Sequence, residues 1–232
     1  TSNANSARGV HSADLDGDGD LDVLSASALD DTIAWYENTD GQGSFGAQQI
    51  ISTDADEAIS VYTSDIDNDG DIDVLSASTR DDKIAWYENT DGLGNFSSQK
   101  IITTNADGAK YVFAVDIDGD GDSDVLSASA FDNKIAWYEN TDGQGNFGSQ
   151  QIISTTTEFA KFVYSADLDN DGDTDVLAAA FGENKVTWFE NTDGLGNFGT
   201  EQIITTETIN PNSVFATDLN GDDSVDVLYA SQ

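Results

Sequence analysis

The sequence predicts an all-β chain built as a β-propeller of four-stranded antiparallel blades, with four full repeats of 51 residues and then half a blade. Two observations predict this fold class: a strict repeat, and several short strand-like segments in each repeat. Trp35, Trp86, Trp137 and Trp188 are spaced 51 residues apart, and no insertion interrupts the period. A period of roughly 50 residues with four strands per repeat is typical of propeller blades.

The third repeat shows how each element is predicted. Four short segments are rich in β-branched and aromatic residues, which favours strands. Clusters of Asp, Asn and Gly separate them and supply turns, and no segment has helical periodicity. Trp137 and Tyr138 point to opposite sides of one strand, so that strand is expected to be buried on both faces. The four predicted strands are 112–115, 125–128, 135–139 and 147–153.

We expect a single propeller domain or propeller fragment over residues 1–232. Its blades are expected at about 8–57, 58–108, 109–159 and 160–210, with a half blade at 211–232. A half blade leaves an unpaired strand edge. Three explanations remain open: a fragment of a larger propeller, strands supplied by another copy in an oligomer or fibre, or five blades closing with one incomplete. The first residue is Thr1 rather than Met, which indicates a processed or excised piece.

Charge is the most unusual feature of the composition. The chain has 45 Asp and Glu against 8 Lys and Arg, a formal net charge of −37. Nucleic acid and anionic membranes are poor partners for such a surface, because both are bound through Lys and Arg. The sequence contains no Cys, no apolar stretch of membrane-spanning length and no signal peptide. The acidic residues recur between apolar segments, which favours a folded cation-binding protein over a disordered one.

An Asp-rich loop begins each repeat and predicts a calcium site. In the third loop, Asp116, Asp118 and Asp120 occupy positions 1, 3 and 5, Gly121 occupies position 6, and Asp124 occupies position 9. This spacing matches the first nine positions of an EF-hand loop, in which alternate side chains converge and position 7 offers a backbone carbonyl. Position 12 lacks the Glu of an EF-hand, so we expect an EF-like loop between two strands. Magnesium requires a stricter octahedron and is the weaker candidate.

The predicted ligands bind about four to five Ca²⁺ ions. In the fifth loop Asp223 stands where the others have Gly, which leaves that site doubtful. The ligands are Asp14, Asp16, Asp18, Asp20 and Asp22; Asp65, Asp67, Asp69, Asp71 and Asp73; Asp116, Asp118, Asp120, Asp122 and Asp124; Asp167, Asp169, Asp171, Asp173 and Asp175; and Asp218, Asn220, Asp222, Ser224 and Asp226.

The Asp loops and the segments that follow them resemble the FG-GAP/VCBS repeat family of calcium-loop propellers. The resemblance rests on the loop followed by Val-Leu, and on the Trp-Tyr-Glu-Asn-Thr-Asp-Gly segment. The Phe-Gly pair occurs at 45–46, 147–148 and 198–199, but the second repeat has Phe96-Ser97. The resemblance implies seven blades, more than this chain can build. It also implies a secreted or cell-surface location, with roles in adhesion or ligand binding.

The leading functional hypothesis is an extracellular, non-enzymatic calcium-binding module for adhesion, surface display or structural assembly. With His11 as its single histidine, expected to be a solvated or strand residue, the chain has little to build a nucleophilic triad from. The alternatives are a lectin-like propeller, an ancillary domain of a secreted polysaccharide-degrading enzyme, and a strand-sharing fibre subunit. Candidate partners besides Ca²⁺ are glycans, another protein, or further copies of the chain. The four Trp residues are expected between blades rather than as sugar-stacking platforms.

Overall fold

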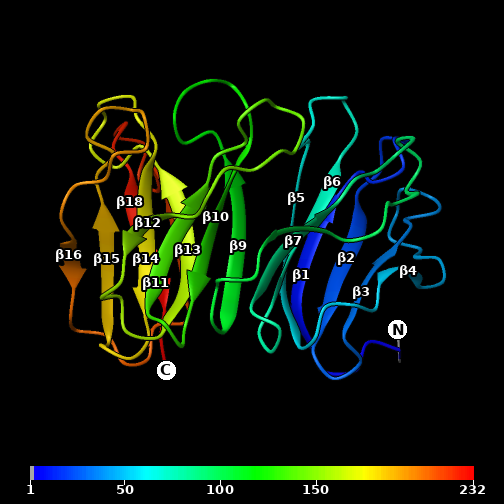
Figure 1. Cartoon of the computed structure of the whole chain (residues 1–232), viewed down its shortest axis with the longest axis horizontal. Helices are drawn as coiled ribbons and strands as arrows, with labels where there is room; N and C mark the ends of the chain where they lie inside the picture. The colour runs from blue at the N-terminus through cyan, green and yellow to red at the C-terminus, as the bar shows by residue number, and fades with distance from the viewer. Residues whose placement is uncertain (1–2) are drawn as a thin grey trace.

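The computed structural model describes residues 3–232, which form strands and turns without any helix (Figure 1). None of these residues therefore belongs to a helix with the length and apolar character needed to cross a membrane. The chain folds into four four-stranded antiparallel sheets and one two-stranded sheet. The repeating four-stranded sheets confirm the all-β prediction.

Each sheet is a meander whose strands pair in chain order. The first sheet contains β1 (Ala7–Ala13), β2 (Asp22–Ser27), β3 (Thr32–Tyr36) and β4 (Gln49–Ser52). The second contains β5 (Ala58–Ser64), β6 (Asp73–Ser78), β7 (Lys83–Tyr87) and β8 (Lys100–Thr103). The third contains β9 (Ala109–Val115), β10 (Asp124–Ser129), β11 (Lys134–Tyr138) and β12 (Gln151–Ser154). The fourth contains β13 (Ala160–Ala166), β14 (Asp175–Ala180), β15 (Lys185–Phe189) and β16 (Gln202–Thr205), and the last contains only β17 (Ser213–Thr217) and β18 (Asp226–Ala230).

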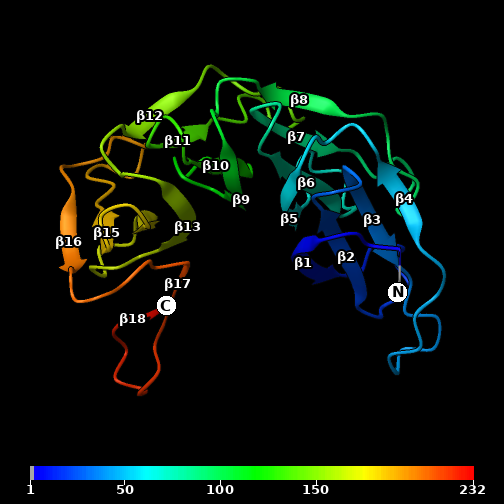
Figure 2. The same cartoon turned by 90° about the horizontal axis from the view of Figure 1, so that it is seen from below.

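The sheets stand side by side in an open arc. Figure 2 shows the first strand of each sheet on the inside of the arc and β4, β8, β12 and β16 on the outside. Neighbouring sheets pack through these inner strands, β1 against β5, β5 against β9, β9 against β13, and β13 against β17. The first and last sheets do not meet, so the alternative in which five blades close into a ring is wrong for this chain.

The hydrophobic core lies between neighbouring sheets. Trp86 and Trp137 are each 2% exposed. Each lies beneath a glycine of the next sheet, since a Cβ on Gly145 would lie 2.2 Å from the ring of Trp86. Burial on both faces explains why the strands carry large residues on both sides. At the end of the arc one face has no neighbour, so Leu228 is 38% exposed while its repeat equivalent Leu126 is fully buried.

An aromatic side chain from every inner strand forms a continuous ladder along the inside of the arc. His11, Tyr62, Phe113, Tyr164 and Phe215 are spaced 51 residues apart. Adjacent ring centroids lie 4.7, 4.6, 5.2 and 4.9 Å from one another, within the range of favourable aromatic pairs. The single histidine is therefore a residue of strand β1 at an aromatic position of the repeat, and it contacts Tyr62.

Candidate metal centres

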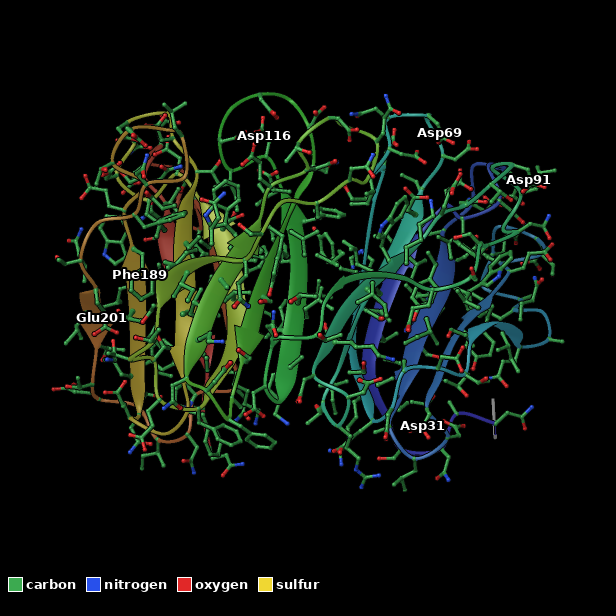
Figure 3. The ribbon with its side chains drawn as sticks, viewed as in Figure 1. Asp31, Asp69, Asp91, Asp116, Phe189 and Glu201 are labelled. Atoms are coloured by element: carbon green, nitrogen blue, oxygen red, sulfur yellow. The ribbon has the colours of Figure 1, made fainter. Side chains whose placement is uncertain are left out.

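The predicted calcium ligands lie in the loops that join the first two strands of each sheet, except that the position 9 ligand is the first residue of the second strand. The inner strands run in the same direction, so these loops gather on one rim of the arc, the upper rim in Figure 3. The figure shows Asp69 and Asp116 on this rim and Asp31, from a β2–β3 turn, on the opposite rim. The loops form because alternating Asp and Gly disfavour regular strand and allow left-handed backbone. Gly121, at position 6 of the third loop, has φ of 94°.

Carboxylates converge in four of the five loops. In the second, third and fourth loops, side chains at positions 1, 3 and 9 offer oxygens within 4.8 Å of one another. In the first loop the converging positions are 1, 3 and 5. The groups are Asp65, Asp67 and Asp73; Asp116, Asp118 and Asp124; Asp167, Asp169 and Asp175; and Asp14, Asp16 and Asp18. Hard oxygen ligands gathered in this way suit Ca²⁺.

The position 1 carboxylate organises the loop around it. In the third loop, Asp116 Oδ1 accepts the backbone N–H of Gly119 at 2.7 Å, and its Oδ2 accepts that of Gly121 at 3.0 Å. Position 5 acts similarly, because Asp120 Oδ1 accepts the N–H of Asp122 at 2.9 Å. These bonds curl the backbone so that the side chains at positions 1, 3 and 9 turn toward one centre.

The position 9 carboxylate is the buried floor of the site. Asp124 is 1% exposed. Its Oδ2 accepts the N–H of Ile117 at 3.0 Å, and its Oδ1 accepts the N–H of Asn140 at 2.8 Å. Asp73 and Asp175 make the same pair of bonds in their own sheets. One side chain thus joins the start of the Asp loop to the end of the third strand.

Burial makes these carboxylates unfavourable as free anions. It raises the pKa of Asp73 and of Asp124 to about 7, against the opposing effect of the backbone hydrogen bonds. Burial, with smaller contributions from neighbouring carboxylates, also raises the pKa of Asp67 and Asp118 at position 3. A bound cation reverses this preference, because its charge favours the ionised form.

Two unpartnered oxygens show that the second loop fits a cation. Oδ1 of Asp65 and Oδ1 of Asp67 are buried, and neither has a hydrogen-bond partner. Buried carboxylate oxygens are costly unless a donor or a metal ion satisfies them. Both residues belong to the converging group of that loop, so the donor set is one that a hard divalent cation would complete.

The position 7 side chains point away from the centre of the loop. A Cβ on Gly143 would lie 2.5 Å from Asp122 Oδ1, which places this carboxylate against the β11–β12 turn of its own sheet. The same oxygen accepts a hydrogen bond from Asn68 Nδ2 of the preceding sheet at 2.8 Å. Asp20, Asp71 and Asp173 lie against the corresponding glycines. In this arrangement the group that position 7 can offer to a bound cation is its backbone carbonyl rather than its side chain.

The fifth loop has the motif without a comparable site. Asp223, in place of Gly, takes a φ of 65°, and Asp218 still accepts the N–H groups of Gly221 and Asp223 at 2.7 and 3.0 Å. However, Asp226 is only partly buried, and Asn220 Nδ2 donates to it at 3.4 Å. No converging acidic group occurs there among the described residues.

A buried asparagine that links neighbouring loops was not singled out by the sequence. The Nδ2 of Asn140, which is fully buried, donates to the carbonyl of Ile66 in the second loop at 2.7 Å. Its backbone N–H donates to Asp124 in the third loop. Asn89 and Asn191 make the same link to Leu15 and Ile117. The repeated Trp-Tyr-Glu-Asn segment carried this signal, but its Asn resembled an ordinary turn residue.

Comparison with known families agrees with this repeated arrangement. The FG-GAP-like repeat family matches the chain four times, over residues 14–76, 65–127, 116–178 and 167–229. These matches span nearly all of the chain, which therefore belongs to the FG-GAP-like repeat family. Each match begins at an Asp loop and ends in the second strand of the next sheet, so the family repeat covers the same junction that the buried asparagine bridges.

Two solved structures share the fold at low sequence identity. One is an Agrocybe aegerita lectin that recognises non-reducing terminal N-acetylglucosamine, with a TM-score of 0.60 and 22% identity; the match covers 84% of this chain and 51% of the lectin. The other is BBS1N in complex with ARL6DN, with a TM-score of 0.60 and 14% identity, covering 89% of this chain and 59% of that one. The chain thus spans about half to three fifths of their length. No curated protein matches it significantly.

Proposed function

We propose that this chain is a calcium-stabilised, non-enzymatic module of the β-propeller type that acts outside the cell in adhesion, surface display or structural assembly. The observation that carries the proposal is the convergence of three carboxylates in each of four loops. The formal net charge of −37 makes such clustering unfavourable without cations. An extracellular setting, where calcium is abundant, suits loops of this kind, whose Kd in extracellular modules is about 10⁻⁴–10⁻³ M.

Calcium would act on the junctions between sheets. In the third loop Asp116, Asp118, Asp120 and Asp124 would hold the ion, together with the backbone carbonyl of Asp122. The ion supplies positive charge that keeps the buried carboxylates ionised. Because Asn140 bonds to both the second and third loops, order in one loop favours order in the next. The loops thereby hold neighbouring sheets in register.

Several features support a structural rather than catalytic role. The chain contains one His and no Cys, and the four converging groups have nearly the same composition. A catalytic metal site needs an open coordination position shaped for one substrate. Four copies of one arrangement at the junctions between sheets are better suited to stabilising the fold.

The proposal is tested by thermal unfolding with and without calcium. One loop held at about 100 times its Kd gains about 2.7 kcal/mol, which is worth about 5–10 °C in a chain of this size. Removing calcium from four such loops should therefore lower the melting temperature by at least about 10 °C. Adding calcium back should restore it, and an equal concentration of magnesium should restore much less. An unchanged melting temperature after complete calcium removal would refute the stabilising role.

Glycan binding is a second candidate, favoured by a cleft between the first and second sheets. The cleft has a volume of about 360 Å³ and is lined by Trp35, Gln49 and Ile50 on one side and by Gly94 and Phe96 on the other. The structural likeness to the Agrocybe aegerita lectin supports this cleft as a candidate sugar site.

A matched variant tests whether the cleft binds sugar. In the second sheet the position of Gln49 is held by Lys100, whose Nζ lies 4.1 Å from the centroid of Trp86 and pairs with Glu88. Gln49→Lys should therefore fill the first cleft without unfolding the protein. A glycan array should show binding by the parent chain that Gln49→Lys loses. Absence of binding to every glycan on the array would remove this candidate.

A further inference from the structure

Three basic residues lie inside the arc, at the ends of the inner strands far from the Asp loops. Arg8, Ile59, Lys110, Lys161 and Asn212 occupy one position of the 51-residue repeat. All five line a single cavity of about 250 Å³. Tyr111 and Phe162 also line it, with ring centroids 3.7 Å apart in a stacked arrangement. We call Arg8, Lys110 and Lys161 the inner basic cluster.

A β-bulge in each of the four inner strands β1, β5, β9 and β13 places Arg8, Ile59, Lys110 and Lys161. The pairing register shifts between Ala7 and Gly9 in β1, and between Ala160 and Phe162 in β13. In β9 the partners of Ser129 and Ala128 are Ala109 and Tyr111, so Lys110 is the extra residue. Bulges bend a strand and redirect its side chains. The repeated bulge therefore turns the same position of four sheets toward one cavity, which is a built feature of the fold.

The inner basic cluster is exceptional in the charge pairing of this protein. Among the described residues, five of the eight Lys and Arg have a carboxylate within 4.0 Å: Arg80, Lys83, Lys100, Lys134 and Lys185. The other three are the members of the inner basic cluster. In a chain with 45 acidic residues, the cations that lack acidic partners are those that line one cavity.

The contacts that these cations do make leave their charge unneutralised. Lys161 donates to the side-chain oxygen of Asn212, and its Nζ lies 4.5 Å from the centroid of Phe181. Lys110 Nζ lies 3.4 Å from Thr79 Oγ1 and 5.2 Å from the centroid of Phe131. Aromatic rings and neutral oxygens orient an ammonium group, but they do not cancel its charge.

Burial and mutual repulsion both act against the cluster. Burial lowers the pKa of Lys110, and the positive charges of Lys161 and Arg8 lower it further, whereas the negative charge of Glu57 raises it. Burial also lowers the pKa of Lys161, again with a contribution from Arg8. Glu57 forms an ion pair with Arg80 instead, with 3.1 Å between Glu57 Oε2 and Arg80 Nε. An anion in the cavity would offset the repulsion between these cations, just as a cation would offset the repulsion between carboxylates in the Asp loops.

We infer that the inner basic cluster binds the carboxylate or sulfate group of a small organic anion no larger than a monosaccharide. Arg8 offers a guanidinium fork suited to a planar carboxylate. Lys110 and Lys161 add point charges from two neighbouring sheets. Tyr111 and Phe162 provide an apolar wall for the rest of the ligand. The site lies at the opposite end of the inner strands from the calcium loops and does not depend on them.

Binding is tested on the full chain in saturating calcium by titration calorimetry and by NMR. The probes are glucuronate, benzoate and inorganic sulfate, with glucose as the uncharged analogue of glucuronate. We expect millimolar binding of glucuronate and benzoate that weakens with added salt, weaker binding of sulfate, and no binding of glucose. If none of the three anions binds at millimolar concentration, the inference is wrong.

Matched variants locate the binding. Lys110→Gln with Lys161→Gln should weaken glucuronate binding about tenfold or more, equivalent to about 1.4 kcal/mol. Lys83→Gln with Lys134→Gln removes the same charge at paired lysines and should leave binding unchanged. Equal losses in the two double variants, or unchanged affinity in the first, would place the anion elsewhere and overturn the assignment.

Two further variants keep the test valid if the first double variant folds poorly. Lys110→Arg with Lys161→Arg retains the charge and should retain binding. Ile59→Lys adds a fourth cation at the same repeat position and should tighten glucuronate binding severalfold. Failure of Ile59→Lys to strengthen binding in a folded protein would contradict the site.

Discussion

The third and fifth Asp loops carry nearly the same motif but build different sites. In the third loop Asp124 is 1% exposed and bonded to Asn140 at the end of the third strand. In the fifth loop the sheet has only two strands, so Asp226 has no such partner and is only partly buried. Asp226 keeps the bond from the N–H of Leu219 at 3.1 Å, and its other donor is the exposed side chain of Asn220 at 3.4 Å. The difference teaches that the motif supplies ligands, whereas the rest of the sheet holds them in place.

The largest expected effect is on the pH dependence of stability in calcium-free protein. The raised pKa values of Asp73 and Asp124, about 7, mean that the folded state binds more protons than the unfolded state between about pH 4 and 7. Stability of the calcium-free chain should therefore fall as pH rises through this window, by an amount on the order of several kcal/mol in total. Thermal melts in metal-stripped buffer at stepped pH measure it.

Calcium and one variant serve as controls for the pH experiment. With saturating calcium the decline should be absent, because the cation keeps the carboxylates ionised. Combined Asp73→Asn, Asp124→Asn and Asp175→Asn should flatten the decline in calcium-free buffer. A calcium-free protein whose stability rises steadily over the same range would show that these carboxylates are not held in buried, unfavourable positions.

Matched substitutions at position 9 test the difference between the third and fifth loops. Asp124→Asn should abolish or weaken one calcium site about tenfold or more, near 1.4 kcal/mol, because it removes charge and leaves one of two backbone N–H donors unpaired. Asp226→Asn should change calcium binding little. Titration calorimetry gives the number and affinity of sites for each variant. Equal effects of the two substitutions would mean that burial and the third strand do not distinguish the loops.

A smaller effect is expected at the asparagine that joins two loops. Asn140→Ala removes the bond to the carbonyl of Ile66 and the acceptor for the N–H of Gly145. We expect weaker calcium binding in both the second and third loops, and a loss of stability of about 1–3 kcal/mol. Asn146→Ala, an exposed residue of the same turn, is the control. An effect confined to the third loop would contradict coupling between sheets.

The smallest effect is expected at position 6. Asp223 holds a left-handed backbone that Gly adopts at less cost, so Asp223→Gly should stabilise the fifth loop by no more than about 1 kcal/mol. The reciprocal Gly121→Asp should lower the stability of the third loop because its left-handed backbone disfavours a side chain. The loss should be small, because the added Cβ would meet no atom within 4 Å. Hydrogen exchange of the two loops reports both changes. A fifth loop that becomes a strong calcium site on this substitution alone would show that Gly, rather than burial, was missing.

The strands were accessible from sequence because they depend on local patterns. The turn residues and the two-faced apolar strand at Trp137 predicted a buried meander, and its register follows from pairing neighbours in the chain. The spacing of Asp116, Asp118 and Asp124 predicted a converging group for the same reason, since nine residues of curled backbone bring alternate side chains together. Asn140 was missed because its partner Ile66 lies 74 residues away in the chain.

The sequence by itself determined the all-β repeat and the positions of the acidic ligands, because a regular period and short loops encode both locally. Only the tertiary structure decided which loops become complete sites, since burial of Asp124 depends on the third strand and the neighbouring sheet. It also decided the open arc and the cavity shared by Arg8, Lys110 and Lys161. Residues 51 apart become neighbours only when whole sheets pack side by side, and that packing depends on burial between them.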